Sequence, residues 1–124
     1  VPAAGRVLLV EDDEMVREVT KDILEAIGYT VLSVETPLDA ITLCEKNGES
    51  IDLLLTDVVM PGLSGKELSD RIKVIRPDIK ILFMSGYTSN VIVHHGILEA
   101  GVHFIQKPFA MRDLARKIRT VLDS

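Results

Sequence analysis

The sequence predicts an α/β fold in which five β–α units build one doubly wound, parallel sheet with helices on both faces. Short apolar runs alternate with stretches of helical period along the chain. The chain has no Trp and only 4% aromatic residues, so Val, Ile and Leu must form the core, as they do around buried parallel strands. A length of 124 residues is enough for one hydrophobic core.

The first half of the chain predicts two strands and two helices. Gly28 ends the first helix. Thr36 and Pro37 supply an N-cap and a first-turn proline for the second helix. The predicted elements are strand Arg6–Val10, helix Glu14–Ile27, strand Thr30–Val34 and helix Pro37–Lys46. Five apolar residues are expected on the inner face of the first helix: Val16, Val19, Ile23, Ala26 and Ile27.

The second half predicts three strands and three helices. The almost wholly apolar run Ile51–Thr56 is typical of a central strand. Ser64 and Glu67 form a capping box for a helix that ends near Pro77. The remaining elements are strand Lys80–Met84, a weaker helix near Ser89–Glu99, strand Val102–Ile105 and helix Met111–Leu122. We therefore expect one domain over residues 6–124, preceded by a short linker at residues 1–5.

The composition argues against several classes of function. The net charge is −5 and Lys and Arg are not clustered, so a nucleic-acid-binding surface is not expected within this chain. No apolar run is long enough to cross a bilayer. The single Cys44 cannot form an internal disulfide, which suits a reducing compartment. We therefore expect a cytoplasmic domain.

Reactive side chains stand where the predicted strands end. They are Glu11, Asp12 and Asp13 after the first strand, Asp57 after the third, Ser85 after the fourth and Lys107 after the fifth. Ligands bind at the carboxyl ends of the strands in open parallel sheets, so these residues are expected to meet at one edge. One of the three consecutive acids can also cap the first helix, and Asp13 is the best placed.

This group of residues predicts a divalent cation and phosphoryl-transfer chemistry. Two carboxylates about 5 Å apart repel each other by roughly 3 kcal/mol at an effective dielectric constant of about 20. Mg²⁺ prefers carboxylates, water and a substrate phosphate, whereas no His or Cys stands at the spacing that zinc needs. Asp57 can then act as a nucleophile. Lys107 would neutralise the transferred group, and Ser85 would donate a hydrogen bond to it.

Four segments carry a resemblance to a known family. They are Leu9–Asp13, Asp57–Gly65, Met84–Tyr87 and Lys107–Phe109, each placed after a predicted strand. In this order they resemble the receiver (CheY-like) domains of two-component response regulators, over residues 6–122 of the chain. Residues 81–124 look most like the receivers of hybrid sensor histidine kinases.

The resemblance implies a flavodoxin-like fold with strand order 2-1-3-4-5. It makes Asp57 the phosphoacceptor, with Lys107 and Ser85 as its catalytic partners. Ser85 and Phe104 would form a switch that responds to the phosphoryl group. The resemblance also implies a cis peptide bond between Lys107 and Pro108.

The resemblance further implies Mg²⁺ as the cofactor. Asp12 and Asp57 would bind the ion directly, Glu11 through water, and Val59 through its backbone carbonyl.

Three details depart from the commonest family pattern. The acidic pair begins with Glu rather than Asp, Val59 places an apolar side chain beside the phosphoacceptor, and Phe104 has no hydroxyl group to donate a hydrogen bond.

The implied partner is the phosphohistidine of a histidine kinase or of a histidine phosphotransfer protein. Phosphorylation would change the face made by the predicted helix at 89–99, the strand at 102–105 and the last helix, and this face could also form a homodimer. The isolated domain would catalyse its own phosphorylation and dephosphorylation. Whether the parent protein is itself an enzyme, such as a histidine kinase, stays open.

Other functions were weighed against this one. A stand-alone or DNA-binding response regulator, or a receiver used only for docking without phosphorylation, remains an alternative. A phosphatase with an aspartyl nucleophile commonly has a second Asp two residues later, where this chain has Val59. A flavodoxin-like cofactor site would suffer repulsion between phosphate and the acids after the first strand. His94 and His95 are expected to be solvated or to face a partner.

Overall fold

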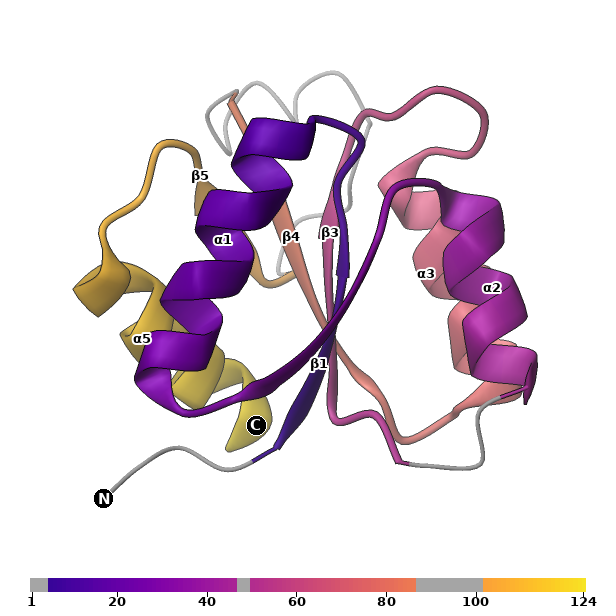
Figure 1. Ribbon diagram of the computed structural model, residues 1–124. Helices are drawn as coiled ribbons and strands as arrows, with labels where there is room; N and C mark the ends of the chain where they lie inside the picture. The colour runs from indigo at the N-terminus through magenta and orange to yellow at the C-terminus, as the bar shows by residue number, and fades with distance from the viewer. Residues whose placement is uncertain (1–4, 47–49, 87–101) are drawn as a thin grey trace.

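A single parallel sheet forms the centre of the computed structural model, which describes residues 5–46, 50–86 and 102–124. Its five strands lie in the order β2-β1-β3-β4-β5 (Figure 1). The strands are β1 (Arg6–Val10), β2 (Thr30–Val34), β3 (Leu53–Asp57), β4 (Lys80–Ser85) and β5 (Phe104–Gln106). The predicted fold class and strand order are therefore confirmed.

Helices cover both faces of this sheet (Figure 1). One face carries α1 (Glu14–Ile27) and α5 (Met111–Leu122), and the other carries α2 (Pro37–Lys46) and α3 (Gly65–Ile75). The helix predicted near residues 89–99, with His94 and His95, lies outside the described residues. Within the described ranges, no helix combines the length and the apolar character that a bilayer span requires.

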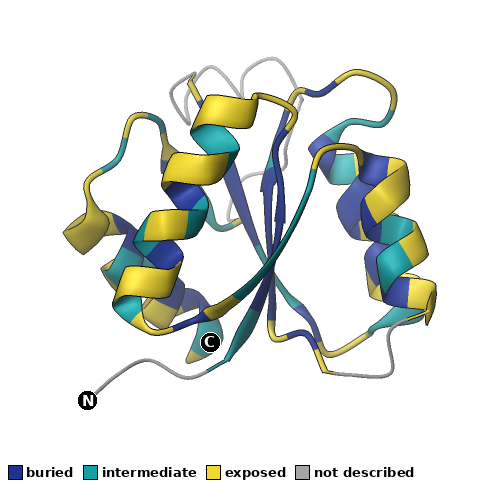
Figure 2. Cartoon of the chain, viewed as in Figure 1, coloured by how far each residue is buried: buried dark blue, intermediate teal, exposed yellow. Residues whose placement is uncertain are grey.

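Two hydrophobic clusters fill the space between the sheet and its helices. Side chains of a strand alternate between the two faces, so Leu9 and Leu55 pack toward α1 and α5, whereas Leu8 and Leu54 pack toward α2 and α3. All four leucines are fully buried, and Figure 2 shows the burial of the central strands. Burying a leucine side chain contributes roughly 2 kcal/mol. The strand ends that carry the acids are thereby held on a rigid support.

Three helix caps predicted from the sequence are present. The Asp13 side chain accepts a hydrogen bond from the Val16 N–H at the start of α1. Ser64 and Glu67 form the reciprocal capping box of α3. Gly28 ends α1 with φ of 120°, a left-handed conformation that glycine adopts without steric cost. Asp13 and Ser64 thus fix where α1 and α3 begin, and Gly28 fixes where α1 ends.

Several strand boundaries differ from the predicted ones. The third strand begins at Leu53 rather than Ile51 and includes Asp57, the fourth extends to Ser85, and the fifth covers Phe104–Gln106 rather than Val102–Ile105. The apolar run that predicted the third strand begins before backbone pairing does, because Ile51 is buried outside the ladder. Asp57 and Ser85 are therefore the last residues of paired strands, held by the backbone of the sheet.

The inner face of α1 was predicted only in part. Thr20 and Leu24 are its buried residues, while Val19 is 53% exposed and Ala26 is also exposed. Val19 and Ala26 lie about 100° around the helix from Thr20. The predicted set counted both of them and left out Thr20 and Leu24, so it placed the face too far to one side.

Substituting Gly65 by Ala tests how closely α3 approaches the end of β3. A Cβ atom there would overlap the carbonyl oxygen of Asp57 and lie 3.0 Å from the Cα atom of Val58. We expect Gly65→Ala to lower the free energy of unfolding by about 1–3 kcal/mol, although Ala normally favours a helix. Urea denaturation measures this change.

Gly86→Ala is the matched control. Its Cβ would meet no described atom within 4 Å, and Gly86 is not among the residues with positive φ. We expect its stability to stay within about 0.5 kcal/mol of the wild type. Equal stability of the Gly65 and Gly86 variants would contradict the close approach.

Candidate functional site

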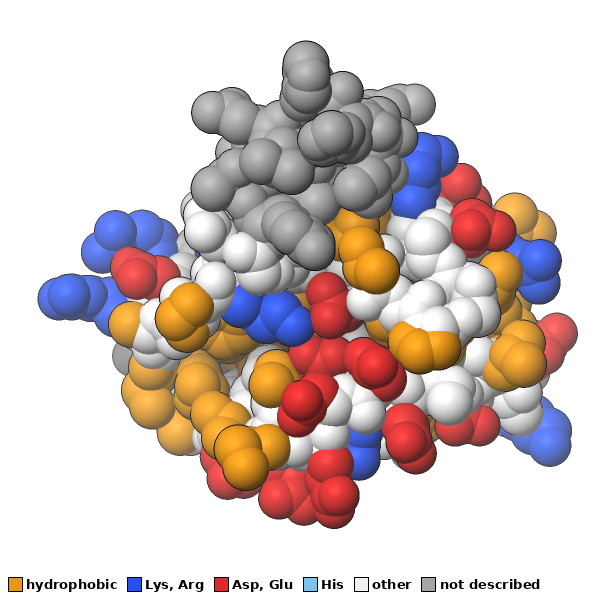
Figure 3. All heavy atoms as spheres, turned by 90° about the horizontal axis from the view of Figure 1, so that it is seen from above, with side chains coloured by type: hydrophobic (Ala, Val, Ile, Leu, Met, Phe, Trp, Pro, Cys, Tyr) orange, Lys and Arg blue, Asp and Glu red, His pale blue; other side chains and the backbone are white. Residues whose placement is uncertain are grey.

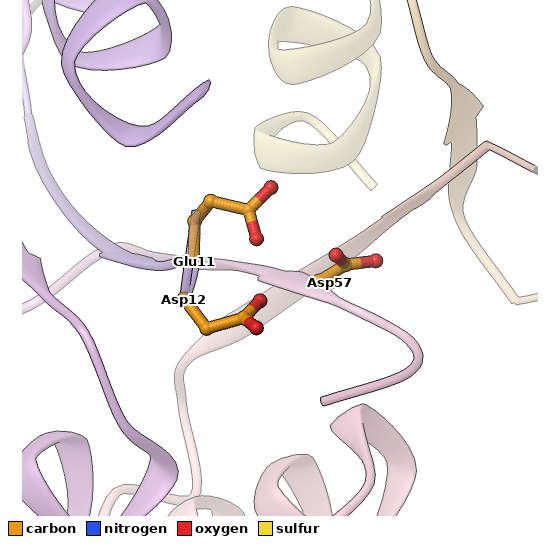
Figure 4. A group of neighbouring side chains, drawn as sticks. All are labelled: Glu11, Asp12 and Asp57. Atoms are coloured by element: carbon orange, nitrogen blue, oxygen red, sulfur yellow. The ribbon is translucent and has the colours of Figure 1, made fainter. Parts of the chain in front are cut away.

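Three carboxylates meet at the carboxyl end of the sheet. Glu11 and Asp12 directly follow β1, and Asp57 ends the neighbouring strand β3. Val10 pairs with Thr56 in the ladder, so the next residues, Glu11 and Asp57, are brought level. One oxygen from each of the three carboxylates lies within 4.8 Å of the others, and the side chains point into the same space (Figure 4).

The three acids differ in their exposure to solvent. Glu11 is 1% exposed, the Asp57 side chain is 14% exposed, and Asp12 is exposed. Figure 3 looks down on this edge and shows acidic side chains gathered near its middle. The group therefore runs from the buried end of β1 to the surface, where a substrate can reach it.

Lys107 connects two of these acids. Its Nζ atom lies 2.8 Å from Oε1 of Glu11 and 3.0 Å from Oδ2 of Asp57. Lys107 follows β5, its backbone N–H donates to the Ser85 carbonyl at 2.7 Å, and its peptide bond to Pro108 is cis, as predicted. The five-strand order thus brings a lysine from near the end of the chain to acids that lie 96 and 50 residues away in the sequence.

Burial and neighbouring charges shift the pKa values of Glu11 and Lys107. Burial raises the pKa of Glu11, and the charge of Asp57 raises it further, although the bond from Lys107 acts in the opposite direction. Burial acts to lower the pKa of Lys107, but its bonds to Glu11 and Asp57 outweigh burial and raise that pKa. Lys107 therefore stays charged, and this one ammonium is shared by two of the three carboxylates.

The residues fit a hard divalent cation. They supply carboxylate oxygens from three side chains, which is the donor type that Mg²⁺ prefers. Oε2 of Glu11 is buried and has no hydrogen-bond partner among the described groups, so an acceptor oxygen is available inside the acidic cluster. The Val59 side chain is 57% exposed, and the part of its backbone carbonyl in metal binding stays a prediction.

Asp57 is held in place by a second hydrogen bond. Its Oδ1 atom accepts from the Val58 N–H at 2.9 Å, while Oδ2 faces Lys107. Each carboxylate oxygen therefore has a different partner. The side chain is thereby held in one orientation.

The two predicted switch residues lie on adjacent strands. Ser85 ends β4, one residue beyond the Asp57–Met84 pair of the ladder, and is 2% exposed. Phe104 begins β5 and packs, partly buried, against Val58 and Phe83. Val58 directly follows Asp57 in the chain, so Phe104 packs against a cluster that includes the immediate neighbour of Asp57.

Two features of the site were not predicted from the sequence. Arg17 on α1 donates from Nη1 to the backbone carbonyl of Glu11 at 2.8 Å, a contact that no motif indicates. An apolar groove of about 520 Å³ also adjoins Lys107, lined in part by Met15, Val19 and Phe109. The apolar residues of α1 are the one sequence feature that could have indicated this groove. The helical pattern instead predicts that Val19 faces the core.

Most of the chain matches one known protein family. Residues 7–119 match the response regulator receiver domain. The chain belongs to this family, whose members are the receivers of two-component signalling.

Two curated relatives differ in how much of their length the chain spans. The chain is 34% identical over 120 residues to the sensor kinase CckA of Brucella abortus (strain 2308), covering 97% of this chain but 13% of the kinase. It is 35% identical over 117 residues to the response regulator receiver protein CpdR of the same organism, covering 94% of this chain and 96% of that protein.

Solved structures agree with the fold and the family. The receiver domain of the hybrid histidine kinase CckA has a TM-score of 0.79 at 36% identity, covering 95% of this chain and 99% of that chain. A CheY-like receiver domain from Methanospirillum hungatei JF-1 has a TM-score of 0.79 at 32% identity, covering 98% and 95% of the two chains.

Proposed function

We propose that the chain accepts a phosphoryl group onto Asp57, from a phosphohistidine of a histidine kinase or a histidine phosphotransfer protein, with Mg²⁺ bound beside it. The observation that carries this proposal is the convergence of Asp57 with Glu11, Asp12 and Lys107 at one strand edge. Membership of the receiver family supports it. The chemistry follows from the groups present.

The transfer is a displacement at phosphorus. A carboxylate oxygen of Asp57 forms the new P–O bond, the P–N bond of the phosphohistidine breaks, and its electron pair stays on the departing imidazole nitrogen. Lys107, 3.0 Å from the Asp57 carboxylate, is placed to neutralise charge on the transferred oxygens. A divalent cation at the acids would add further positive charge there, in the position that phosphoryl-transfer sites use.

The metal would be held by Asp12 and Asp57, with Glu11 contributing through water and Val59 through its carbonyl. Excess negative charge and the unpartnered Oε2 atom of Glu11 support a cation at this place. Lys107 already offsets part of the repulsion. A single divalent ion would offset the remaining repulsion between the acids.

Phosphorylation would act as a switch through Ser85 and Phe104. The added charge on Asp57 would draw the Ser85 hydroxyl toward the phosphoryl oxygens. Phe104 would then move with the cluster of Val58 and Phe83 against which it packs. Such a change biases an existing equilibrium between two arrangements of the surface, and β5 with α5 provides the described part of that surface.

We further propose that the chain is the receiver of a hybrid sensor histidine kinase in the cytoplasm, with residues 6–124 as the domain. Similarity to the receiver of CckA supports this parentage. Similarity to CpdR over 96% of that protein supports the alternative, a stand-alone response regulator. The two differ in the partner that donates the phosphoryl group, and not in the chemistry at Asp57.

Phosphorylation of the purified chain tests the central proposal. Incubated with acetyl phosphate and Mg²⁺, the wild type is expected to gain the mass of one phosphoryl group, measured by intact mass spectrometry. Asp57→Asn removes the nucleophile and should stay unmodified, and a chelator should abolish the gain. Asp13→Asn is the matched control, because Asn also caps a helix and the same charge is lost; it should react like the wild type. An unmodified wild type, or a modified Asp57→Asn, would refute the proposal.

The switch is tested with a stable phosphoryl mimic. Adding beryllofluoride and Mg²⁺ to the wild type is expected to shift the aromatic NMR signals of Phe104, because the mimic recruits Ser85. Ser85→Ala should bind the mimic at Asp57, seen in the Asp57 and Val58 amide signals, but leave the Phe104 signals near their starting positions. A Phe104 shift of equal size in Ser85→Ala would show that Ser85 does not transmit the change.

A further inference from the structure

Arg17 reaches from α1 back to the turn that carries the acidic pair. Its Nη1 atom donates to the carbonyl oxygen of Glu11 at 2.8 Å in a partly buried position. That carbonyl belongs to the peptide group that joins Glu11 to Asp12. We propose that Arg17 is a positioning residue for the cation site, and that it holds this peptide plane so that the Asp12 carboxylate faces Glu11 and Asp57.

Among the described residues, the other hydrogen bonds of the turn fix the chain on either side of this peptide and not the peptide itself. The Glu11 N–H donates to the Val34 carbonyl of β2 at 3.3 Å, which fixes the chain before the peptide. The Asp13 side chain accepts from the Val16 N–H at 3.0 Å, which fixes the chain after Asp12. Between these anchors, rotation of the Glu11–Asp12 peptide changes the direction of the exposed Asp12 side chain. The Arg17 bond opposes that rotation.

The positioning role and the charge of Arg17 predict opposite changes in Mg²⁺ affinity when this side chain is removed. Arg17 is a cation near an acidic group, so the loss of its charge alone would strengthen the attraction for a second cation. The loss of a hydrogen bond that orients a ligand would weaken binding instead, as removal of partners beyond the ligands themselves typically does. The sign of the change in Mg²⁺ affinity therefore separates the two roles.

The test is a titration of the whole chain with Mg²⁺ alone, followed by the amide NMR shifts of Asp57 and Val58. We expect Arg17→Met to weaken binding about tenfold and to move the Glu11 carbonyl ¹³C signal. Arg17→Lys keeps the charge and a shorter donor, so it should recover part of the affinity. It also provides a second variant if Arg17→Met folds poorly in a urea denaturation check.

Lys21→Met is the matched control, because it removes the same charge one turn further along α1. Lys21 makes no hydrogen bond to the acidic turn in the described ranges, so its Mg²⁺ affinity should stay within about twofold of the wild type or rise. The inference would be overturned if Arg17→Met bound Mg²⁺ as tightly as the wild type. It would also be overturned if Lys21→Met lost as much Mg²⁺ affinity as Arg17→Met. The inference rests on the proposed metal site. A wild type without Mg²⁺-dependent shifts would overturn both, whereas normal wild-type binding with an unaffected Arg17→Met overturns only this one.

Discussion

Glu11, Asp12 and Asp57 repel one another, and the surrounding structure holds them together in spite of this repulsion. Carboxylates this close are unfavourable without a cation, and Glu11 is almost completely buried. The parallel register of β1 and β3 brings the acids together, and the leucines beneath them prevent the strand ends from moving apart. The loop after β5 brings Lys107 into contact with two of the acids. Three carboxylates against one ammonium leave negative charge in excess, which favours a divalent cation at this edge.

Features with a local cause could be predicted from the sequence. The aliphatic runs of β1 and β3, the Asp13 cap and the Ser64–Glu67 box each depend on neighbouring residues, and the structure contains all of them. The strand-end acids and Lys107 could be placed at one edge because parallel strands end together. Their approach to within hydrogen-bonding distance follows from the same topology. The chemical roles of these residues rest on the family resemblance.

Features that depend on tertiary contacts could not be predicted. The Arg17 bond joins a side chain to a backbone carbonyl six residues earlier, and residue type does not encode that geometry. The inner face of α1 includes Thr20, which an apolar pattern excludes, and leaves Val19 beside a groove next to Lys107. Burial of Glu11 could not be read from a run of three acids, because it depends on the packing of the sheet and on a lysine 96 residues away. Such contacts determine how the site is oriented, while the local patterns determine where it lies.

Stability measured in the presence of a chelator shows whether Lys107 offsets the repulsion between the acids. Lys107→Met removes the ammonium that faces Glu11 and Asp57 and leaves the buried carboxylate without its partner. We predict a loss of about 1–3 kcal/mol in the free energy of unfolding at neutral pH, below the usual cost of breaking a fully buried pair because Lys107 is partly exposed. Lys66→Met, which breaks the exposed pair with Asp70, should cost less than about 1 kcal/mol. If Lys107→Met were as stable as Lys66→Met, the acids would not depend on this lysine, and the account of the site would be wrong.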